Sequence, residues 1–235
     1  MKKIIPFILV ILVTAGLSAG VVWLLLNVNQ RMQEGKETHV KVVELDESVA
    51  DPAVWGKNFP REYDSYKKTV DTARTRYGGS EAFSKLDDDP AWKAIFSGYP
   101  FGVDYREERG HAYSLIDQQE TERTKQFKQP GACLQCHAGG MKHVYETVGK
   151  GDLQKGFEEV CKMPIKEAWN YVKHPVACVD CHDPKTMDLR VTRPGFINGI
   201  KHVKEKQGIK DFDPNTMSTR QEMRTFVCAQ CHVEY

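Results

Sequence analysis

Three pentapeptides of the chain share one pattern: two cysteines separated by two variable residues, with a histidine directly after the second cysteine. They are CLQCH at 133–137, CVDCH at 178–182 and CAQCH at 228–232. On a helical turn, positions i, i+3 and i+4 lie on one face. Two thiols at this spacing can form thioether bonds to the two vinyl groups of one haem, while the adjoining imidazole binds the iron. The pattern is the attachment signature of c-type haem, so the sequence predicts three covalent haems.

Each pentapeptide would supply two thiols and one iron ligand. The residues concerned are Cys133, Cys136, His137, Cys178, Cys181, His182, Cys228, Cys231 and His232. Other uses of paired cysteines fit less well. A zinc ribbon needs two Cys-x-x-Cys pairs for each metal ion, so three pairs leave one unmatched. A thioredoxin-like redox pair occurs once, after a strand, and disulfides do not require a histidine after every pair.

One cysteine and five histidines lie outside the pentapeptides. Cys161 has no second cysteine at motif spacing and is interpreted as a buried structural thiol. The histidines are candidates for the second ligand of each iron. A second strong ligand makes an iron an electron-transfer centre, whereas an open position makes it a catalytic one. Counting residues does not assign a histidine to an iron, so all five stay candidates at this point: His39, His111, His143, His174 and His202.

The N-terminus predicts export. Lys2 and Lys3 precede an uncharged run at 4–26, which as a helix would reach about 34 Å and cross a hydrocarbon core of about 30 Å. The run is longer than the apolar centre of a signal peptide, about 7–15 residues. We therefore favour an uncleaved anchor in the inner membrane over a cleaved signal peptide. Both interpretations place the body of the protein in the periplasm.

The rest of the chain reads as one helical domain. Apolar content of 40% and charged content of 28% are typical of a globular protein. The net charge of +1 gives no reason to expect a nucleic-acid partner. Extended alternating runs are scarce, whereas Ser218 and Gln221 have capping-box spacing before the third pentapeptide. We expect a signal or anchor segment at 1–26, a polar tether at 27–50, and a mainly α domain with long loops and little β structure at 51–235.

Several segments between residues 51 and 235 resemble the pentahaem cytochrome c nitrite reductases, which form ammonia. They are WGKNFPREYDSY, GGSE, GYPFGVDYREERGHAY, DQQETERT, HDPKTMDLRVTRPGF and CAQCHVEY. The resemblance implies that the first haem along the chain, on Cys133 and Cys136, is catalytic and binds nitrite on its open side. Nitrite would be reduced to ammonium by six electrons, with the other two haems relaying electrons.

The resemblance also implies roles for single residues. Arg123 of ETERT and Tyr235 of HVEY would line the active site. Glu234, together with the backbone carbonyl of Tyr235, would bind calcium. His111 of RGHA would be the second iron ligand of the third haem. An arginine supplies permanent positive charge for an anion such as nitrite, and a tyrosine hydroxyl can donate a hydrogen bond or help deliver a proton.

Two departures from the family pattern are visible. Most members carry lysine as the iron ligand of the catalytic haem, whereas this chain has His137, so it resembles the histidine-ligated branch. Members are also longer and carry five haems. The resemblance therefore implies an N-terminal part of a longer protein that forms a homodimer. Its electron donor would be a membrane quinol dehydrogenase or a multihaem cytochrome. The alternative function is a non-catalytic electron-transfer multihaem cytochrome, in which every iron has two strong ligands and Arg123 has no role.

Overall fold

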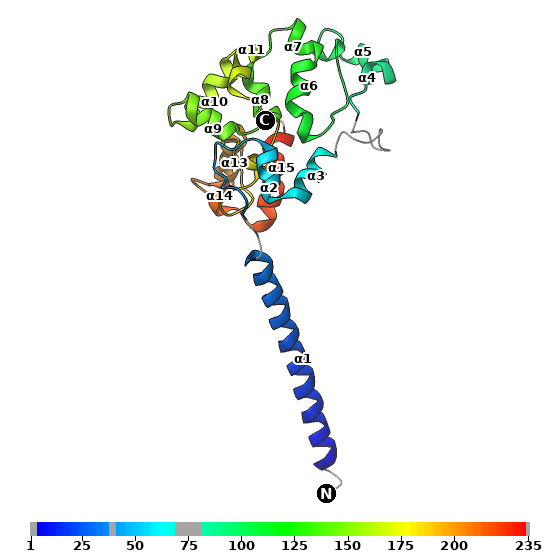
Figure 1. Ribbon diagram of the computed structural model, residues 1–235. Helices are drawn as coiled ribbons and strands as arrows, with labels where there is room; N and C mark the ends of the chain where they lie inside the picture. Colours follow the sequence, from blue (N-terminus) through cyan, green and yellow to red (C-terminus); the bar gives the residue numbers. More distant parts are fainter. Residues whose placement is uncertain (1–3, 38–40, 69–80, 234–235) are drawn as a thin grey trace. The chain divides into compact units, whose positions relative to one another are not determined.

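A computed structural model describes residues 4–37, 41–68 and 81–233 of the chain (Figure 1). It divides into two compact units, Met1–Val42 and Val43–Tyr235. Three of the sequence predictions, for His39, Glu234 and Tyr235, concern residues outside the described ranges, as does most of the GGSE segment.

The first unit is dominated by one long helix, α1 (Ile4–Glu37). Its stretch Phe7–Gln33 contains an 18-residue window with a mean hydropathy of 2.5 and is long and apolar enough to cross a membrane. The expected apolar N-terminal helix is therefore confirmed. It continues beyond Leu26 into residues that we expected to belong to a polar tether, because this segment is rich in good helix formers such as Gln, Met, Arg and Glu.

The second unit is built from short helices joined by loops. Backbone pairing within the described residues is limited to isolated bridges, such as the one between Pro130 and Pro164. The expected mainly α fold with long loops is confirmed. The α-helices are α2 (Pro52–Asn58), α3 (Pro60–Lys67), α4 (Lys85–Asp88), α5 (Ala91–Ile95), α6 (Ser114–Glu120), α7 (Glu122–Gln126), α8 (Leu134–His137), α9 (Met141–Val148), α10 (Leu153–Lys162), α11 (Ile165–Ala168), α12 (Cys178–Cys181), α13 (Pro194–Lys206), α14 (Pro214–Met217) and α15 (Arg220–His232). The 3-10 helices are η1 (Pro100–Gly102), η2 (His111–Tyr113), η3 (Gly131–Cys133) and η4 (Trp169–Tyr171).

The main apolar core surrounds the first pentapeptide. Leu134, one of its variable residues, is 0% exposed and packs with residues of α6, α9 and α10. Burying a leucine in this way contributes about 1.5–3 kcal/mol to the stability of the fold. The packing of Leu134 therefore fixes the position of this turn. The buried members of this cluster are Leu115, Leu134, Ala138, Met141, Val144, Tyr145, Val160, Ala168 and Val172.

A second cluster joins the beginning of the folded unit to the middle pentapeptide. Trp55 is 0% exposed and packs with Ala177 and Val179, and Leu45 and Val49 lie against the same cluster. The indole Nε1 of Trp55 donates a hydrogen bond to the Val49 carbonyl oxygen at 2.7 Å. Residues 43–50 therefore pack within the folded unit, although we expected that unit to begin at residue 51.

The third cluster holds α15, the helix that ends in the third pentapeptide. Val191, Phe196 and Ala229 are its buried members. The capping box that starts α15 lies one residue later than expected from Ser218 and Gln221. It is formed by Thr219 and Glu222, whose side chains accept hydrogen bonds from each other's backbone N–H at 2.8 and 3.2 Å.

A close backbone approach joins the first pentapeptide to the segment before the second. The N–H of Gly139 donates to the carbonyl oxygen of His174 at 2.9 Å. A Cβ atom at residue 139 would overlap the carbonyl oxygen of Pro175 and lie 3.2 Å from the Cβ of Ala177. Only glycine fits here without movement of one segment.

Gly139→Ala is therefore expected to destabilise the haem-loaded protein by about 1–3 kcal/mol, the usual cost of overpacking. Guanidinium unfolding followed by far-ultraviolet circular dichroism measures the change. Gly199→Ala in α13 is the matched control, because a Cβ there has nothing within 4 Å, and helical alanine is about 0.5–1 kcal/mol better than glycine. Equal stabilities for the two variants would contradict the proposed close approach.

Candidate functional site

All three pentapeptides form helical turns, as their spacing predicted. Cys133 ends η3 and the rest of the first pentapeptide forms α8. The second forms α12, with His182 directly after it, and the third is the last turn of α15. Their thiols are free and at least partly accessible. The second and third turns each bring their two cysteines and their histidine to one cavity, as thioether attachment requires.

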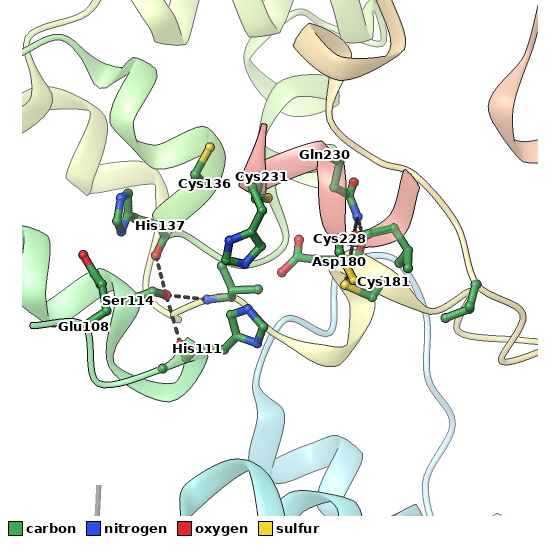
Figure 2. A pocket seen from close by; sticks show the side chains of 15 residues that line it. Glu108, His111, Ser114, Cys136, His137, Asp180, Cys181, Cys228, Gln230 and Cys231 are labelled. Carbon is green, nitrogen blue, oxygen red and sulfur yellow. Dashed lines mark hydrogen bonds between the residues drawn. The ribbon is translucent and has the colours of Figure 1, made fainter. Parts of the chain in front are cut away.

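A central cavity of about 470 Å³ collects residues from all three pentapeptides (Figure 2). Cys136 and His137 reach it from the first, Cys181 from the second, and Cys228, Cys231 and His232 from the third. The Ser114 hydroxyl lies at its wall, 2.9 Å from the His137 carbonyl oxygen and 3.0 Å from that of His111. The Ser114 hydroxyl oxygen also accepts a hydrogen bond from the N–H of Val176 at 3.1 Å. Segments far apart in the chain therefore meet around one space.

His111 and His232 face each other in this cavity. Their ring centroids are 6.1 Å apart. A metal–imidazole bond of about 2 Å on each side of one metal ion puts the two ring centres about 6 Å apart, so the observed separation fits an iron held between them. Burial is the main cause that lowers the pKa of His111, which favours the neutral, metal-binding imidazole.

A second cavity, of about 450 Å³, adjoins the middle pentapeptide. It is lined by Cys178, Cys181 and His182 together with the aromatic rings of Trp55 and Phe59, an apolar surface suited to a porphyrin. The Nδ1 atom of His182 lies 2.9 Å from the Met187 carbonyl oxygen. A carbonyl can only accept, so Nδ1 carries the proton and Nε2 is left to bind a metal.

The first pentapeptide has an unsatisfied histidine. His137 Nδ1 is buried and has no hydrogen-bond partner within the described part of the chain. Its Nε2 lies 3.3 Å from the amide nitrogen of Gln118. Burial lowers the pKa of His137, and the nearby charge of Arg123 lowers it further. A buried neutral imidazole with an orphaned nitrogen is the arrangement expected of a ligand whose metal centre belongs in the fold.

The thiols of Cys136 and Cys231, from different pentapeptides, act on each other. Their interaction raises the pKa of Cys136 and lowers that of Cys231 to about 7, with the cation of Arg193 adding to the second effect. The Cys231 sulfur also lies 3.9 Å from the carbonyl oxygen of Gln135 in the first pentapeptide. The first and third haem-attachment turns therefore lie next to each other, although almost a hundred residues separate them in the chain.

Arg123 lies beside the first pentapeptide. The Nε of Arg123 donates a hydrogen bond at 3.3 Å to the hydroxyl oxygen of Thr121, which is the N-cap of α7. Its guanidinium carbon is 4.3 Å from the ring centroid of Phe101, a cation–π contact. The Arg123 cation favours the thiolate of Cys133, although burial raises the pKa of that thiol.

A small cavity of about 20 Å³ is lined by Arg123 together with the acidic residues Glu108 and Asp117. This volume is sufficient for about one water molecule. Burial is the main cause that raises the pKa of Glu108, with repulsion from Asp117 next. The structure therefore brings Arg123, a titratable carboxyl group and room for water to the side of the first attachment turn.

The remaining candidates are less involved. His143 and His202 are exposed and His174 is half-buried, and none of the three lines either large cavity. Cys161 is half-buried rather than fully buried, and burial raises the pKa of its thiol to about 11. Its resistance to ionisation agrees with an unreactive structural thiol.

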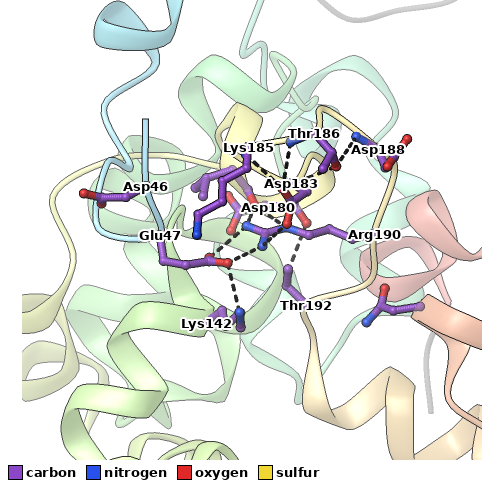
Figure 3. A network of polar contacts seen from close by, with 12 residues as sticks. Asp46, Glu47, Lys142, Asp180, Asp183, Lys185, Thr186, Asp188, Arg190 and Thr192 are labelled. Carbon is purple, nitrogen blue, oxygen red and sulfur yellow. Dashed lines mark hydrogen bonds and ion pairs between the residues drawn. The ribbon is translucent and has the colours of Figure 1, made fainter. Parts of the chain in front are cut away.

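Sequence reasoning missed a polar network around the middle pentapeptide; Figure 3 shows the part of it that contains Glu47, Lys142, Asp180, Arg190 and Thr192. Its centre is a buried ion pair between Asp180 and Arg193, which are 4% and 0% exposed at their side chains. The sequence held one indication of this network. Asp180 and Gln230 are polar residues within attachment turns that are flanked by apolar residues. A partly exposed branch lies beside it, where Glu47 accepts hydrogen bonds from Lys142 and Arg190. Burial raises the pKa of Glu47, but these two hydrogen bonds outweigh it and lower the pKa.

Attachment turns, paired histidines and porphyrin-sized apolar cavities define a multihaem c-type cytochrome. The family model described as Cytochrome c552 matches residues 51–235. The chain belongs to the cytochrome c552 family.

The similar proteins include nitrite reductases. A cytochrome c-552 of Porphyromonas gingivalis is 34% identical over 76% of this chain and 34% of its own length. The cytochrome c nitrite reductase subunit NrfA of Nitratidesulfovibrio vulgaris is 33% identical over 75% of this chain and 34% of its own length. The chain spans about a third of the length of these relatives.

A solved structure supports the same relationship. Cytochrome c nitrite reductase of Desulfovibrio desulfuricans, described with two calcium sites in its catalytic subunit, superimposes with a TM-score of 0.65 at 30% identity. The superposition covers 82% of this chain and 42% of that one. The expected family resemblance and the mainly helical fold are confirmed.

Proposed function

We propose that this chain is the N-terminal part of an ammonia-forming nitrite reductase, with three covalent haems on its three pentapeptides and five in the whole protein. The haem on Cys133 and Cys136 is the catalytic one. The observation that carries the proposal is the contrast between two attachment turns. His111 faces His232 across 6.1 Å at the third, whereas the cationic Arg123 lies beside His137 at the first.

The chemistry requires binding an anion and supplying protons. Nitrite takes up six electrons and eight protons to give ammonium and two water molecules. Haem, when bound, supplies an iron atom for the nitrite nitrogen and the electrons for its reduction. Arg123 binds the nitrite oxygens, because its guanidinium offers permanent charge and several donors in a fixed plane. Thr121 and Phe101 hold this side chain in place.

Each haem has named residues in this proposal. His137, His182 and His232 are the iron ligands on the attachment side, and His111 is the second ligand of the third haem. The second and third haems, held by His182 and His232, would supply electrons to the first. The apolar linings of the two large cavities support this assignment, because contact with apolar side chains keeps water from the porphyrin.

Two further residues, Glu234 and Tyr235, belong to the proposed site. Tyr235 contributes its hydroxyl as a hydrogen-bond or proton donor. Glu234 and the Tyr235 carbonyl oxygen bind Ca²⁺, whose preference is for hard oxygen ligands. Their support is the HVEY segment and the calcium sites of the solved relative.

The proposed setting is the periplasm, with α1 retained in the inner membrane. A helix that is long and apolar enough to span a bilayer supports this placement, and so does the extracytoplasmic chemistry of c-type haem. The proposed partners are nitrite, a quinol dehydrogenase or multihaem cytochrome as electron donor, and a second copy of the protein.

The test is electron paramagnetic resonance of the haem-loaded protein, produced in a host that matures c-type cytochromes. A high-spin ferric signal that shifts when nitrite is added is expected, because the first haem keeps an open position. A spectrum that contains low-spin signals alone and does not respond to nitrite would instead establish the electron-transfer cytochrome. A pyridine haemochrome assay on the 235-residue chain is expected to give three haems per chain.

A further inference from the structure

The buried pair of Asp180 and Arg193 occupies the junction of the attachment turns. Asp180 is a variable residue of the middle pentapeptide. Its Oδ1 accepts from Arg193 Nη1 at 2.9 Å and from the N–H of Gly140 at 3.0 Å. Its Oδ2 accepts from the N–H of Ala177 at 2.8 Å. One carboxylate therefore holds the start of α12 and the residues that follow the first pentapeptide.

The arginine extends this junction to the first turn. Arg193 is 0% exposed, and its Nη2 donates to the carbonyl oxygen of Ala138, which directly follows His137, at 2.9 Å. Its Nε finds no hydrogen-bond partner among the residues that the structure describes. The guanidinium thus sits in the interior with its charge balanced by Asp180.

The third turn joins through an amide. Gln230, a variable residue of the third pentapeptide, donates from Nε2 to the Asp180 carbonyl oxygen at 3.3 Å. Its Oε1 accepts from the N–H of Thr192 at 2.8 Å. The middle and third pentapeptides and the residues that directly follow the first are therefore bonded to one network, which is centred on the buried ion pair of Asp180 and Arg193.

The two charges also act on the sulfurs that would bond to haem. Arg193 interacts electrostatically with the thiols of Cys136, Cys181 and Cys231, and Asp180 interacts with Cys181 and Cys231. Solvent does not screen a pair that is almost fully buried, so its field at a neighbouring group is much stronger than in water.

A ferric haem carries one more positive charge than a ferrous haem. A nearby cation therefore favours the ferrous form and raises the reduction potential, whereas a nearby anion lowers it. We propose that Asp180 and Arg193 are positioning residues that set the reduction potentials of the haems on this chain, through opposing charges at the junction of the three attachment turns. This inference rests on the proposed haem attachment.

The test compares three variants by spectroelectrochemical titration of the haem-loaded protein. Arg193→Met leaves the carboxylate without its counter-charge. It is expected to shift the ferric/ferrous equilibrium of at least one haem about tenfold toward the ferric form, which corresponds to a reduction potential about 59 mV lower for one electron. Asp180→Asn leaves the guanidinium unbalanced and is expected to shift the same haem in the opposite direction by a similar factor. The double variant removes both charges and is expected to return to within about threefold of the unmodified protein.

A purely structural role would not give this pattern, because the double variant would then be disturbed at least as much as either single variant. Shifts of the same sign in both single variants, or a double variant displaced as far as a single one, would overturn the inference. If Arg193→Met does not accumulate, the difference between Asp180→Asn and the double variant still reports the effect of the arginine charge.

Lys85→Met is the matched control. It removes a half-buried cation from an ion pair with Glu107 at 3.0 Å. Neither Lys85 nor Glu107 belongs to a pentapeptide or lines the central cavity. Unchanged potentials are expected. A chain that binds no haem would refute the proposed function. A haem-loaded chain whose reduction potentials are unchanged by the Asp180 and Arg193 substitutions would refute this inference alone.

Discussion

Replacing both Cys133 and Cys136 by serine is expected to lower the haem content of the 235-residue chain from three to two and, in the whole protein, to abolish the proposed nitrite reduction. A serine hydroxyl does not replace a thiol in the thioether bond to a haem vinyl group. The remaining pentapeptides keep their own sulfurs and imidazoles, and the apolar core around Leu134 does not depend on the two thiols. A pyridine haemochrome assay and nitrite consumption with a reduced dye measure the two effects.

Cys161→Ser is the matched control for this experiment, since it makes the same chemical change at a cysteine outside the pentapeptides. It is expected to keep three haems on the 235-residue chain and to leave the nitrite reduction of the whole protein unchanged. Three haems on the double-serine chain, or continued nitrite reduction by the whole protein with both serines, would show that the catalytic haem is not attached at the first pentapeptide.

Arg123→Gln is expected to reduce kcat for nitrite by about 10²–10³-fold, the usual effect of removing one preorganised electrostatic donor from an active site. Glutamine can still donate hydrogen bonds but lacks the permanent charge that Arg123 places beside His137 and Cys133. Steady-state kinetics of the whole mature protein, with the haem content determined in parallel, measures the change.

The control is Lys125→Gln on the same short helix. Lys125 is exposed and pairs with Glu122 at 2.8 Å, and exposed pairs of this kind contribute at most about 1 kcal/mol. Its nitrite kinetics are expected to match those of the unmodified protein. Equal kinetics for the two glutamine variants would remove Arg123 from the proposed active site.

The local features of this fold could be predicted because each depends on neighbouring residues. The i, i+3, i+4 spacing predicted the attachment turns, and the uncharged run at 4–26 predicted the first helix. The start of α15 was wrong by one residue, since Thr219 and Glu222 have the same spacing as Ser218 and Gln221. Hydroxyl and carboxamide or carboxylate groups compete for such a cap, and position in the fold decides between them.

The spatial features could not be predicted in this way. Counting left five histidines equivalent, and the approach of His111 to His232 depends on segments more than a hundred residues apart. The contact between Asp180 and Arg193 likewise needs the loop after α12 to return to its own helix. The packing of residues 43–50 on Trp55 was missed because a short polar segment with a few apolar residues resembles a linker by composition.

The close approach of the first and third attachment turns bears on the order in which the protein is assembled. Each porphyrin must meet its own two reduced sulfurs, yet in the compact chain the Cys231 sulfur of the third turn lies 3.9 Å from the Gln135 carbonyl oxygen of the first. If the chain folded before haem attachment, thiols of different pentapeptides would lie side by side and would be less accessible to the haem vinyl groups. Cofactor loading is thus expected to proceed turn by turn on an open chain, with the final collapse following the last bond.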